Sequence, residues 1–277
     1  YFRVGKLLFK KIDFAKIYNN ETPYFVTQII SFVELSSEIN EFDSARQVLE
    51  GFRDVINSKS KDYIIYCKLE CSYNWHRLDN KEAVKWGEQA VNLVKSSKAD
   101  IDFDLEHGLN LAKRDTREEK YINEALQFFL KGTKIEDIVN SSIDENLSAQ
   151  YYGNLGRCYF FLKKYDIAIS LYSRAFRLAY KEEISMKYMN RGFVSYWIGQ
   201  LLEKKGDDKM SYFFYSNCMY YWKKHSPHRA IRVDDEIKIL KREIPDIEDI
   251  LKLDNDTIEN QCKKYNDKQL QLTMHYK

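Results

Sequence analysis

A triplet of residues at helical spacing recurs five times along this chain. One copy consists of Ala168, Tyr172 and Ala175, and the other copies begin at Ala45, Ala83, Ala125 and Ser211. Residues four and seven positions apart lie on one face of an α-helix, and small residues on such a face let a second helix approach closely. Consecutive copies start 38 to 43 residues apart. The chain is therefore predicted to fold as a series of helix pairs, with each triplet on the second helix of a pair.

The amino-acid composition favours helices over sheets. The 277 residues include only 3 prolines and 10 glycines, too few turn-forming residues for a sandwich or barrel of many short strands. Hydrophobic residues make up 44% of the chain, which is enough for a substantial core. We predict an all-α protein. The aromatic run "MSYFFYSNCMYYW" (210–222) carries one of the triplets, so its rings are expected to pack in the core, with an exposed stacking surface as the alternative.

The segment "YYGNLGRCYFFLKKYDIAISLYSRAFRLAY" (151–180) resembles a tetratricopeptide repeat (TPR). It has the bulky residue, the Leu-Gly pair and the Tyr of that family's first helix, followed by the Ala, aromatic, Ala pattern of the second helix. The resemblance implies a TPR-like α-solenoid of about five helix-turn-helix repeats with a C-terminal capping helix. The repeats would be longer than the compact family form of about 34 residues. The fourth copy fits the family pattern best and the third copy fits it least.

The chain is predicted to have four parts. They are an N-terminal helix or connector (1–22), the helical-repeat array (23–225), a capping helix (226–252) and a polar C-terminal tail (253–277). Thr22-Pro23 and Ser226-Pro227 both pair an N-cap residue with a proline suited to a first helical turn, so each is interpreted as a helix start. Because the sequence begins with Tyr1, we expect it to belong to a longer chain with which it could associate.

Charge and cysteine content bear on partners and location. The 44 Lys and Arg residues nearly balance the 42 Asp and Glu residues, so no global charge favours nucleic acid or an anionic membrane. No apolar run approaches the roughly 18 residues that span a bilayer. The five cysteines are odd in number and lie mostly in apolar stretches, which is typical of thiols in a reducing compartment. We expect a cytoplasmic protein that binds neither membrane nor nucleic acid.

Sequence patterns of catalytic and cofactor sites are absent. The chain has no glycine-rich phosphate-binding loop, no H-E-x-x-H and no G-x-S-x-G stretch. Cys67 and Cys71 lie near His76, and His225 lies near His228, but neither group supplies the four ligands of a closed zinc site. We therefore predict a protein that is not an enzyme and has no cofactor and no metal site.

The family resemblance also implies a binding face. In tetratricopeptide arrays the first helices of the repeats line a concave face that holds a peptide, a helix or the surface of another protein. The corresponding inward positions are Ile65, Lys68, Ser72 and Trp75 in the second repeat, Gln150, Gly153, Arg157 and Phe160 in the fourth, and Phe193, Tyr196, Gln200 and Glu203 in the fifth. Asn154 is a further candidate, because it matches, with Arg157, the clamp of family members that bind a C-terminal carboxylate. Phe193 and Trp197 stand where family members that bind a C-terminal carboxylate have basic residues, so such a ligand is not expected.

These features predict a non-catalytic protein-binding or peptide-binding module. Similar extended arrays form the C-terminal sensor regions of bacterial STAND-type NTPases, so the resemblance implies the target-recognition part of a larger signalling or antiviral-defence protein. Two alternatives stay open: a peptide-sensing regulator of the intracellular quorum-sensing receptor type, and an accessory subunit of an enzyme complex. An upstream P-loop would favour the NTPase sensor, and an upstream helix-turn-helix would favour the regulator.

Overall fold

The computed structural model describes residues 2–10, 12–58, 60–181, 186–245 and 247–274. All regular secondary structure in these ranges is helical, and they contain no β-strand, so the prediction of an all-α protein is confirmed. The chain divides into two compact units, which we call unit 1 (residues 1–125) and unit 2 (residues 126–277). Within the described ranges, every helix is too short or too polar to cross a membrane.

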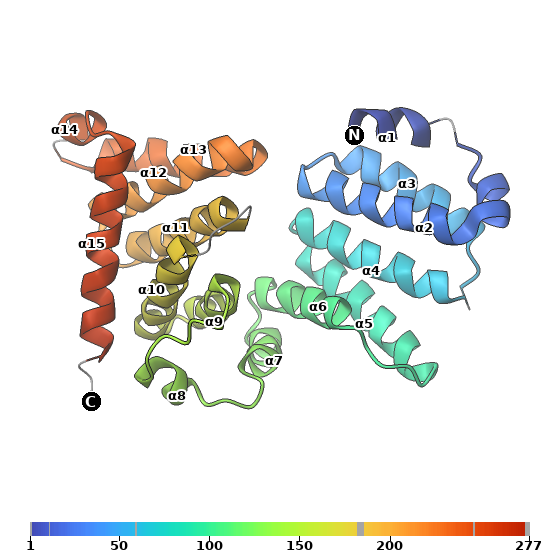
Figure 1. The fold of residues 1–277 in the computed structure, drawn as a ribbon, viewed down its shortest axis with the longest axis horizontal. Helices are drawn as coiled ribbons and strands as arrows, with labels where there is room; N and C mark the ends of the chain where they lie inside the picture. Colours follow the sequence, from blue (N-terminus) through green and yellow to red (C-terminus); the bar gives the residue numbers. More distant parts are fainter. Residues whose placement is uncertain (1, 11, 59, 182–185, 246, 275–277) are drawn as a thin grey trace. The chain divides into compact units, whose positions relative to one another are not determined.

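Unit 1 is built from helical hairpins, in which two helices joined by a short loop pack together (Figure 1). Its helices are α1 (Phe2–Phe9), α2 (Phe14–Glu38), α3 (Phe42–Val55), α4 (Lys61–His76), α5 (Asn80–Ser96), α6 (Phe103–Asp115) and the first part of α7 (Glu119–Leu130). α2 pairs with α3, α4 pairs with α5, and α6 packs against α5. The first helices of successive hairpins are also neighbours, because α4 contacts both α2 and α6.

Unit 2 contains two further hairpins and a helical C-terminal part (Figure 1). Its helices after α7 are α8 (Ile135–Asn140), α9 (Ala149–Phe161), α10 (Tyr165–Lys181), α11 (Met186–Lys204), α12 (Asp208–His225), α13 (Pro227–Glu243), α14 (Ile247–Leu251) and α15 (Asn255–Met274). α9 pairs with α10, α11 pairs with α12, and α10 contacts α11. α13 packs against α12, and α15 packs against both α10 and α12.

The same turn recurs after the first helix of each hairpin. One residue adopts the left-handed conformation, with φ of 60° to 77°, at Asn40, Leu78, Arg117, Lys163 and Gly206. In four of these loops, all except the one at Arg117, the next N–H donates to the carbonyl five residues earlier, at 2.8 to 3.0 Å, as in a Schellman motif. A second hydrogen bond also recurs. The residue five positions after the left-handed residue lies on the second helix, and its N–H donates to the carbonyl of the residue directly after the left-handed one. The donors are Ala45, Ala83, Ile122, Ala168 and Ser211.

This recurring turn corrects the position of the third triplet. The sequence placed its start at Ala125, whereas the structural equivalent of Ala83 and Ala168 is Ile122, whose N–H donates to the Glu118 carbonyl at 2.9 Å. Ile122 is 1% exposed and Ala125 is fully buried. Residues three apart lie on the same helical face, so a search for small residues selects Ala125 although the turn fixes Ile122.

Small residues on the first helices accept the aromatic rings of the second helices. A Cβ atom added to Gly156 would lie 2.5 Å from the Tyr172 ring, and one added to Gly199 would lie 2.7 Å from Cδ1 of Tyr215. Both tyrosines are fully buried middle residues of their triplets. In the run 210–222, Phe214 is also fully buried, whereas Tyr220 is 40% exposed. Most of these rings therefore belong to the core, as predicted.

Two helix starts were inferred from prolines, and only one is found. α13 begins at Pro227 after Ser226. The predicted start at Thr22-Pro23 is wrong, because α2 begins at Phe14 and contains Pro23 in its interior. Asp13 caps this longer helix by accepting the N–H of Lys16 at 3.2 Å. The predicted division between 1–22 and 23–225 therefore falls inside α2.

The segment predicted as a polar tail (253–277) contains the packed helix α15. Its buried residues recur every four positions, at Ile258, Cys262, Asn266 and Leu270. Glu259 accepts hydrogen bonds from Tyr221 of α12 and from Lys263. Burial alone would raise the pKa of Glu259, but these two hydrogen bonds lower it below its ordinary value. α15 is therefore held by a narrow apolar face and by polar contacts.

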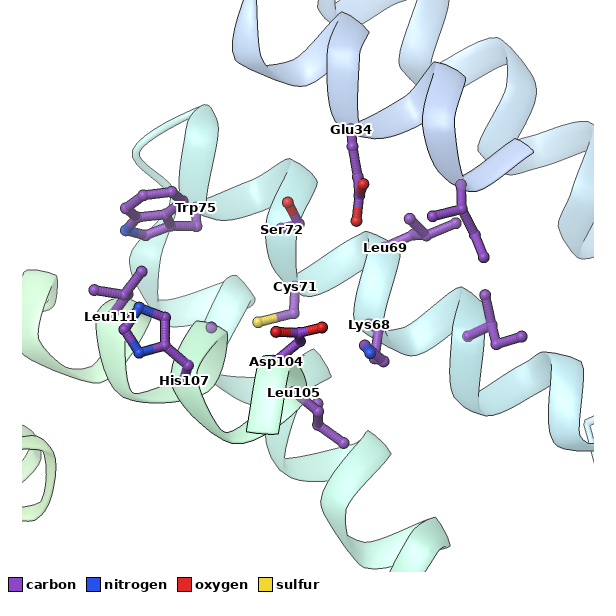
Figure 2. Close-up of a pocket in the computed structure, with 13 residues that line it drawn as sticks. Glu34, Lys68, Leu69, Cys71, Ser72, Trp75, Asp104, Leu105, His107 and Leu111 are labelled. Carbon is purple, nitrogen blue, oxygen red and sulfur yellow. The ribbon is translucent and has the colours of Figure 1, made fainter. Parts of the chain in front are cut away.

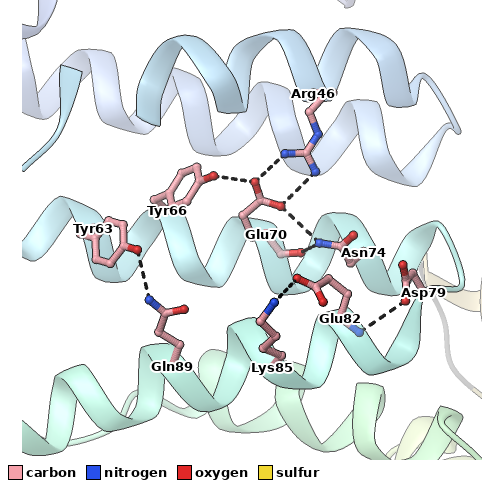
Figure 3. Close-up of polar contacts among 9 residues, drawn as sticks. All are labelled: Arg46, Tyr63, Tyr66, Glu70, Asn74, Asp79, Glu82, Lys85 and Gln89. Carbon is pink, nitrogen blue, oxygen red and sulfur yellow. Dashed lines mark hydrogen bonds and ion pairs between the residues drawn. The ribbon is translucent and has the colours of Figure 1, made fainter. Parts of the chain in front are cut away.

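A buried carboxylate connects α3 to α4 in unit 1 (Figure 3). The Glu70 side chain is 2% exposed and accepts from Arg46 Nη1 at 2.7 Å and Arg46 Nη2 at 3.1 Å. It also accepts from the Tyr66 hydroxyl at 2.8 Å and from Asn74 Nδ2 at 3.2 Å. A charge that is buried this deeply is tolerated because its oxygens are paired with donors.

A buried guanidinium fixes the short helix α8 in unit 2. Arg174 of α10 is fully buried, and its Nη2 donates to the carbonyls of Val139 and Ser141 at 2.7 and 2.9 Å. Burial lowers the pKa of the Arg174 guanidinium below its ordinary value. The positive group sits at the C-terminal end of α8, where the carbonyls have no partners within the helix.

Candidate functional site

A pocket of about 490 Å³ lies in unit 1, and its walls come from α2, α4 and α6 (Figure 2). α4 supplies its largest share, with Ile65, Lys68, Leu69, Cys71, Ser72 and Trp75. These residues are mostly spaced by three or four positions, so they form one face of the helix. The volume lies within the roughly 300–1,000 Å³ that ligand pockets occupy in proteins.

α6 forms the opposite wall through one face of its own. That face carries Asp104, Leu105, His107, Gly108 and Leu111, while α2 adds Ile30 and Glu34. The N-cap Asp102 fixes the start of α6 by accepting the Leu105 N–H at 2.8 Å.

The same Asp102 also holds the lysine of the pocket. Both of its carboxylate oxygens accept from Lys68 Nζ at 3.0 Å. Burial alone would raise the pKa of Asp102, but the hydrogen bonds from Leu105 and Lys68 keep it below its ordinary value. The positive charge of Lys68 is therefore already paired within the protein.

The other end of the pocket is aromatic. Trp75 donates its indole N–H to Oδ2 of Asp115 at 2.9 Å, which fixes the orientation of the ring. His107 stacks on Phe103 with ring centroids 5.4 Å apart. Lys68 and Trp75 are seven positions apart on α4, or about 10 Å along the helix axis. Figure 2 shows Trp75, His107 and Leu111 at one end, and Glu34, Asp104 and Lys68 at the other.

The floor of the pocket is apolar and unreactive. Leu69, Cys71 and Leu105 are each at most 4% exposed. Burial raises the pKa of the Cys71 thiol to about 12, although a hydrogen bond with the Gly87 backbone opposes this rise. The thiol is therefore neutral at physiological pH and is not an activated nucleophile. All five cysteines of the chain are buried.

Two carboxylates reach the charged end of the pocket from different helices. Glu34 extends from α2 and Asp104 from α6. Partial burial raises the pKa of Glu34, the positive charge of Lys68 lowers it, and the negative charge of Asp104 raises it further. The described part of the chain places no Lys, Arg or His within ion-pair distance of either carboxylate.

The predicted binding residues of the second repeat all line this pocket. Lys68 and Trp75 do so together with Ile65 and Ser72. The remaining predicted residues belong to unit 2. Whether any of them binds a partner stays a prediction.

In unit 2 the predicted polar residues form hydrogen bonds with one another. Arg157 Nη1 donates to Gln200 Oε1 at 2.6 Å, and Gln200 Nε2 donates to the Tyr196 hydroxyl at 2.9 Å. Tyr196 in turn donates to Glu236 Oε1 at 3.4 Å. The Arg157 guanidinium also lies over the rings of Phe160 and Phe161, at 5.2 and 4.5 Å. These contacts join α9, α11 and α13.

The other predicted residues of unit 2 are mixed in exposure. Gln150 is exposed, whereas Asn154 is buried. A Cβ atom added to Gly153 would lie 2.3 Å from the Trp197 ring, so this position is filled by the next hairpin. Phe193 packs against Trp222, with ring centroids 5.2 Å apart. Glu203 accepts the Tyr215 hydroxyl at 2.8 Å.

Sequence reasoning missed the contributions of α2 and α6 to the pocket. It named neither Glu34 of α2 nor Asp104 of α6, and the segment that forms α6 fits the family pattern poorly. A usable signal was present: Leu105, Leu109 and Ala112 follow the N-cap Asp102 at helical spacing, and all three are buried.

Comparisons of this chain with protein-family models, with curated proteins and with solved structures found no match. Inferences about function therefore rest on the pocket and on its surroundings in unit 1. In the described ranges, no group of three or more His, Cys, Asp or Glu side chains could hold a metal ion.

Proposed function

We propose that this chain is a non-catalytic module that binds a peptide or a segment of another protein in the pocket of unit 1. The pocket itself is the observation that carries the proposal. Three helices that follow one another in space line it, its floor is apolar, and its two ends differ in polarity. A groove of this kind can bury apolar side chains and orient a chain by its polar groups.

We further infer that the hairpins are tetratricopeptide-like repeats. The recurring left-handed turn and the constant five-residue offset to the second helix support this inference. α2 and α4 are the first helices of their hairpins, α6 precedes the matching left-handed turn at Arg117, and first helices line the ligand face in that family. The pocket therefore occupies the face on which this family binds its partners.

The chemistry of the pocket favours binding over catalysis. Its thiol, Cys71, is neutral at physiological pH. A cytoplasmic location is part of the same proposal. The sensor, regulator and accessory-subunit contexts stay predictions.

Gly108 of α6 allows a sharp test of the site. It lines the pocket, and an added Cβ atom would meet no atom within 4 Å. Gly108→Trp should fill the pocket, whereas Gly108→Ala should leave it open. Both substitutions remove a glycine from a helix interior, which favours the helix by roughly 0.5–1 kcal/mol for alanine and by less for tryptophan. The pair therefore separates blockage of the pocket from any loss of folding.

Binding is measured with a displayed library of random short peptides selected on the purified chain. Selected peptides are labelled with fluorescein, and their dissociation constants are measured by fluorescence polarisation. We expect Gly108→Trp to weaken binding at least about tenfold and Gly108→Ala to leave it nearly unchanged. Failure to enrich any peptide would refute the proposed function. Peptides whose affinity is unchanged by Gly108→Trp but reduced by Arg157→Ala would instead assign binding to unit 2.

A further inference from the structure

We propose that the pocket of unit 1 selects a segment that places a lysine or arginine side chain between Glu34 and Asp104, with an apolar side chain next to it toward Trp75. This inference rests on the proposed function and names the chemistry of the ligand.

Negative charge is in excess at this end of the pocket. Lys68 is the only positively charged residue among those that line the pocket in the described ranges, and both oxygens of Asp102 already bind it. In the described ranges, neither Glu34 nor Asp104 has a Lys, Arg or His side chain within ion-pair distance. The pocket thus presents an excess of negative charge in a chain whose overall charge is nearly balanced.

The two carboxylates also act on each other. Partial burial raises the pKa of Glu34, the positive charge of Lys68 lowers it, and the negative charge of Asp104 has a smaller raising effect, so Glu34 and Asp104 are near enough to repel when both are ionised. A cation between them would relieve this repulsion and bind both. A lysine ammonium or an arginine guanidinium has several N–H donors and can bind two carboxylates together.

The walls fit the rest of such a side chain. Ile65, Leu69 and Leu105 lie along the pocket and can cover the alkyl stem of lysine or arginine while its charged end reaches the carboxylates. Trp75 and Leu111 stand at the opposite end, about two helical turns away along α4. A neighbouring apolar side chain of the ligand can pack there, which gives the ligand a direction.

The test compares carboxylate substitutions at matched charge. Glu34→Gln with Asp104→Asn removes the two charges from the pocket, and both residues are exposed, so the fold should be retained. Glu50→Gln with Asp54→Asn is the control, because these exposed residues of α3 lie outside the pocket lining and their change in net charge is the same. The probe is the best peptide selected from the random library on the unsubstituted chain.

We expect the selected peptides to share a lysine or arginine next to an aromatic or aliphatic residue. The Glu34/Asp104 variant should weaken binding at least about tenfold, and the control should change it less than about twofold. Replacing the basic residue of the peptide by norleucine should cause a similar loss on the unsubstituted chain and little further loss on the Glu34/Asp104 variant. Such non-additivity would assign the cation to these two carboxylates.

Other outcomes overturn the inference and are distinguishable from each other. Peptides that depend on Gly108 but carry no basic residue, or that bind the Glu34/Asp104 variant equally well, would refute the basic ligand and leave the proposed function standing. Loss of all peptide selection would refute both. Self-association that the Glu34/Asp104 substitutions abolish, seen by analytical ultracentrifugation, would make a second copy of this chain the occupant.

Discussion

Replacing Arg46 by methionine tests the buried carboxylate that connects α3 to α4. The substitution keeps an unbranched side chain but removes both donors to Glu70, at 2.7 and 3.1 Å. Glu70 then retains only the Tyr66 hydroxyl and Asn74 Nδ2 as side-chain donors. Its side chain is 2% exposed, so water cannot replace the lost bonds without local opening.

The expected cost follows from the unequal exposure of the two partners. Breaking a buried ion pair by removing one partner costs roughly 3–5 kcal/mol, because the other charge stays buried without compensation. Arg46→Met leaves such a carboxylate, and we expect a loss of about 3 kcal/mol. Glu70→Leu leaves Arg46, whose side chain is 32% exposed and can rehydrate, so its cost should be nearer 2 kcal/mol. The double variant should cost about the same as either single variant, which gives a coupling of about 2 kcal/mol.

The measurement must report on unit 1 alone. Tryptophan fluorescence does not, because Trp75 and Trp86 lie in unit 1 whereas Trp197 and Trp222 lie in unit 2. Amide hydrogen exchange of α3 and α4, followed by mass spectrometry at increasing urea concentration, gives the free energy of opening for these helices. A loss below about 1 kcal/mol for Arg46→Met, or strictly additive effects in the double variant, would refute a buried and mutually dependent pair.

Three further perturbations test unit 2. Gly153→Ala should lower the free energy of unfolding by about 1–3 kcal/mol because its Cβ would lie 2.3 Å from the packed Trp197 ring, and an unchanged thermal melt would contradict that contact. Arg174→Met should leave two carbonyls at the end of α8 without their donor and cost about 1–3 kcal/mol, seen as faster exchange in α8 and not in α12. The pKa of Glu259 is lowered in the folded chain, so its stabilisation is present above its ordinary pKa of 4.5 and is lost as the pH falls through the folded value. The opening equilibrium of α15, obtained from hydrogen exchange corrected for the intrinsic exchange rate at each pH, should therefore rise on acidification more in the unsubstituted chain than in Glu259→Gln, and equal pH dependence would exclude this role.

The hairpins could be predicted from the sequence because close helix contacts restrict residue size. Gly156 and Gly199 leave room for Tyr172 and Tyr215, and a larger side chain at either glycine would clash with a ring. This restriction appears in the sequence as small residues at fixed spacing from an aromatic. The third hairpin lacks it, since Ile122 occupies the equivalent position, and there the predicted alignment was three residues off.

Other elements could not be predicted because their stability depends on contacts distant in sequence. α15 appears polar because its buried residues form a narrow row, spaced by four, that packs against α10 and α12. Its remaining attachment is a carboxylate, Glu259, whose partner Tyr221 is 38 residues earlier. Pro23 was assigned to a helix start by its residue type alone, whereas the N-cap that forms is Asp13. Local patterns contain no information on such partners.

The site was only partly predictable for a related reason. A polar side chain can bind a ligand only if other groups of the protein have not already taken up its hydrogen bonds or its charge. Arg157, Tyr196 and Gln200 have the side-chain types of interface residues, yet they bind one another in unit 2. Lys68 lines the pocket of unit 1, but Asp102 binds it. The two carboxylates that we propose bind the ligand are Glu34 and Asp104. Acidic side chains are mostly exposed in folded proteins, so their residue type alone predicts only a solvated surface position. Their role becomes visible only when the fold brings α2 and α6 to the same pocket, where the two carboxylates face one space and Lys68 forms its ion pair with Asp102. Ligand preference in such a module is therefore set by the charge that remains after internal pairing, which residue type at a single position cannot reveal.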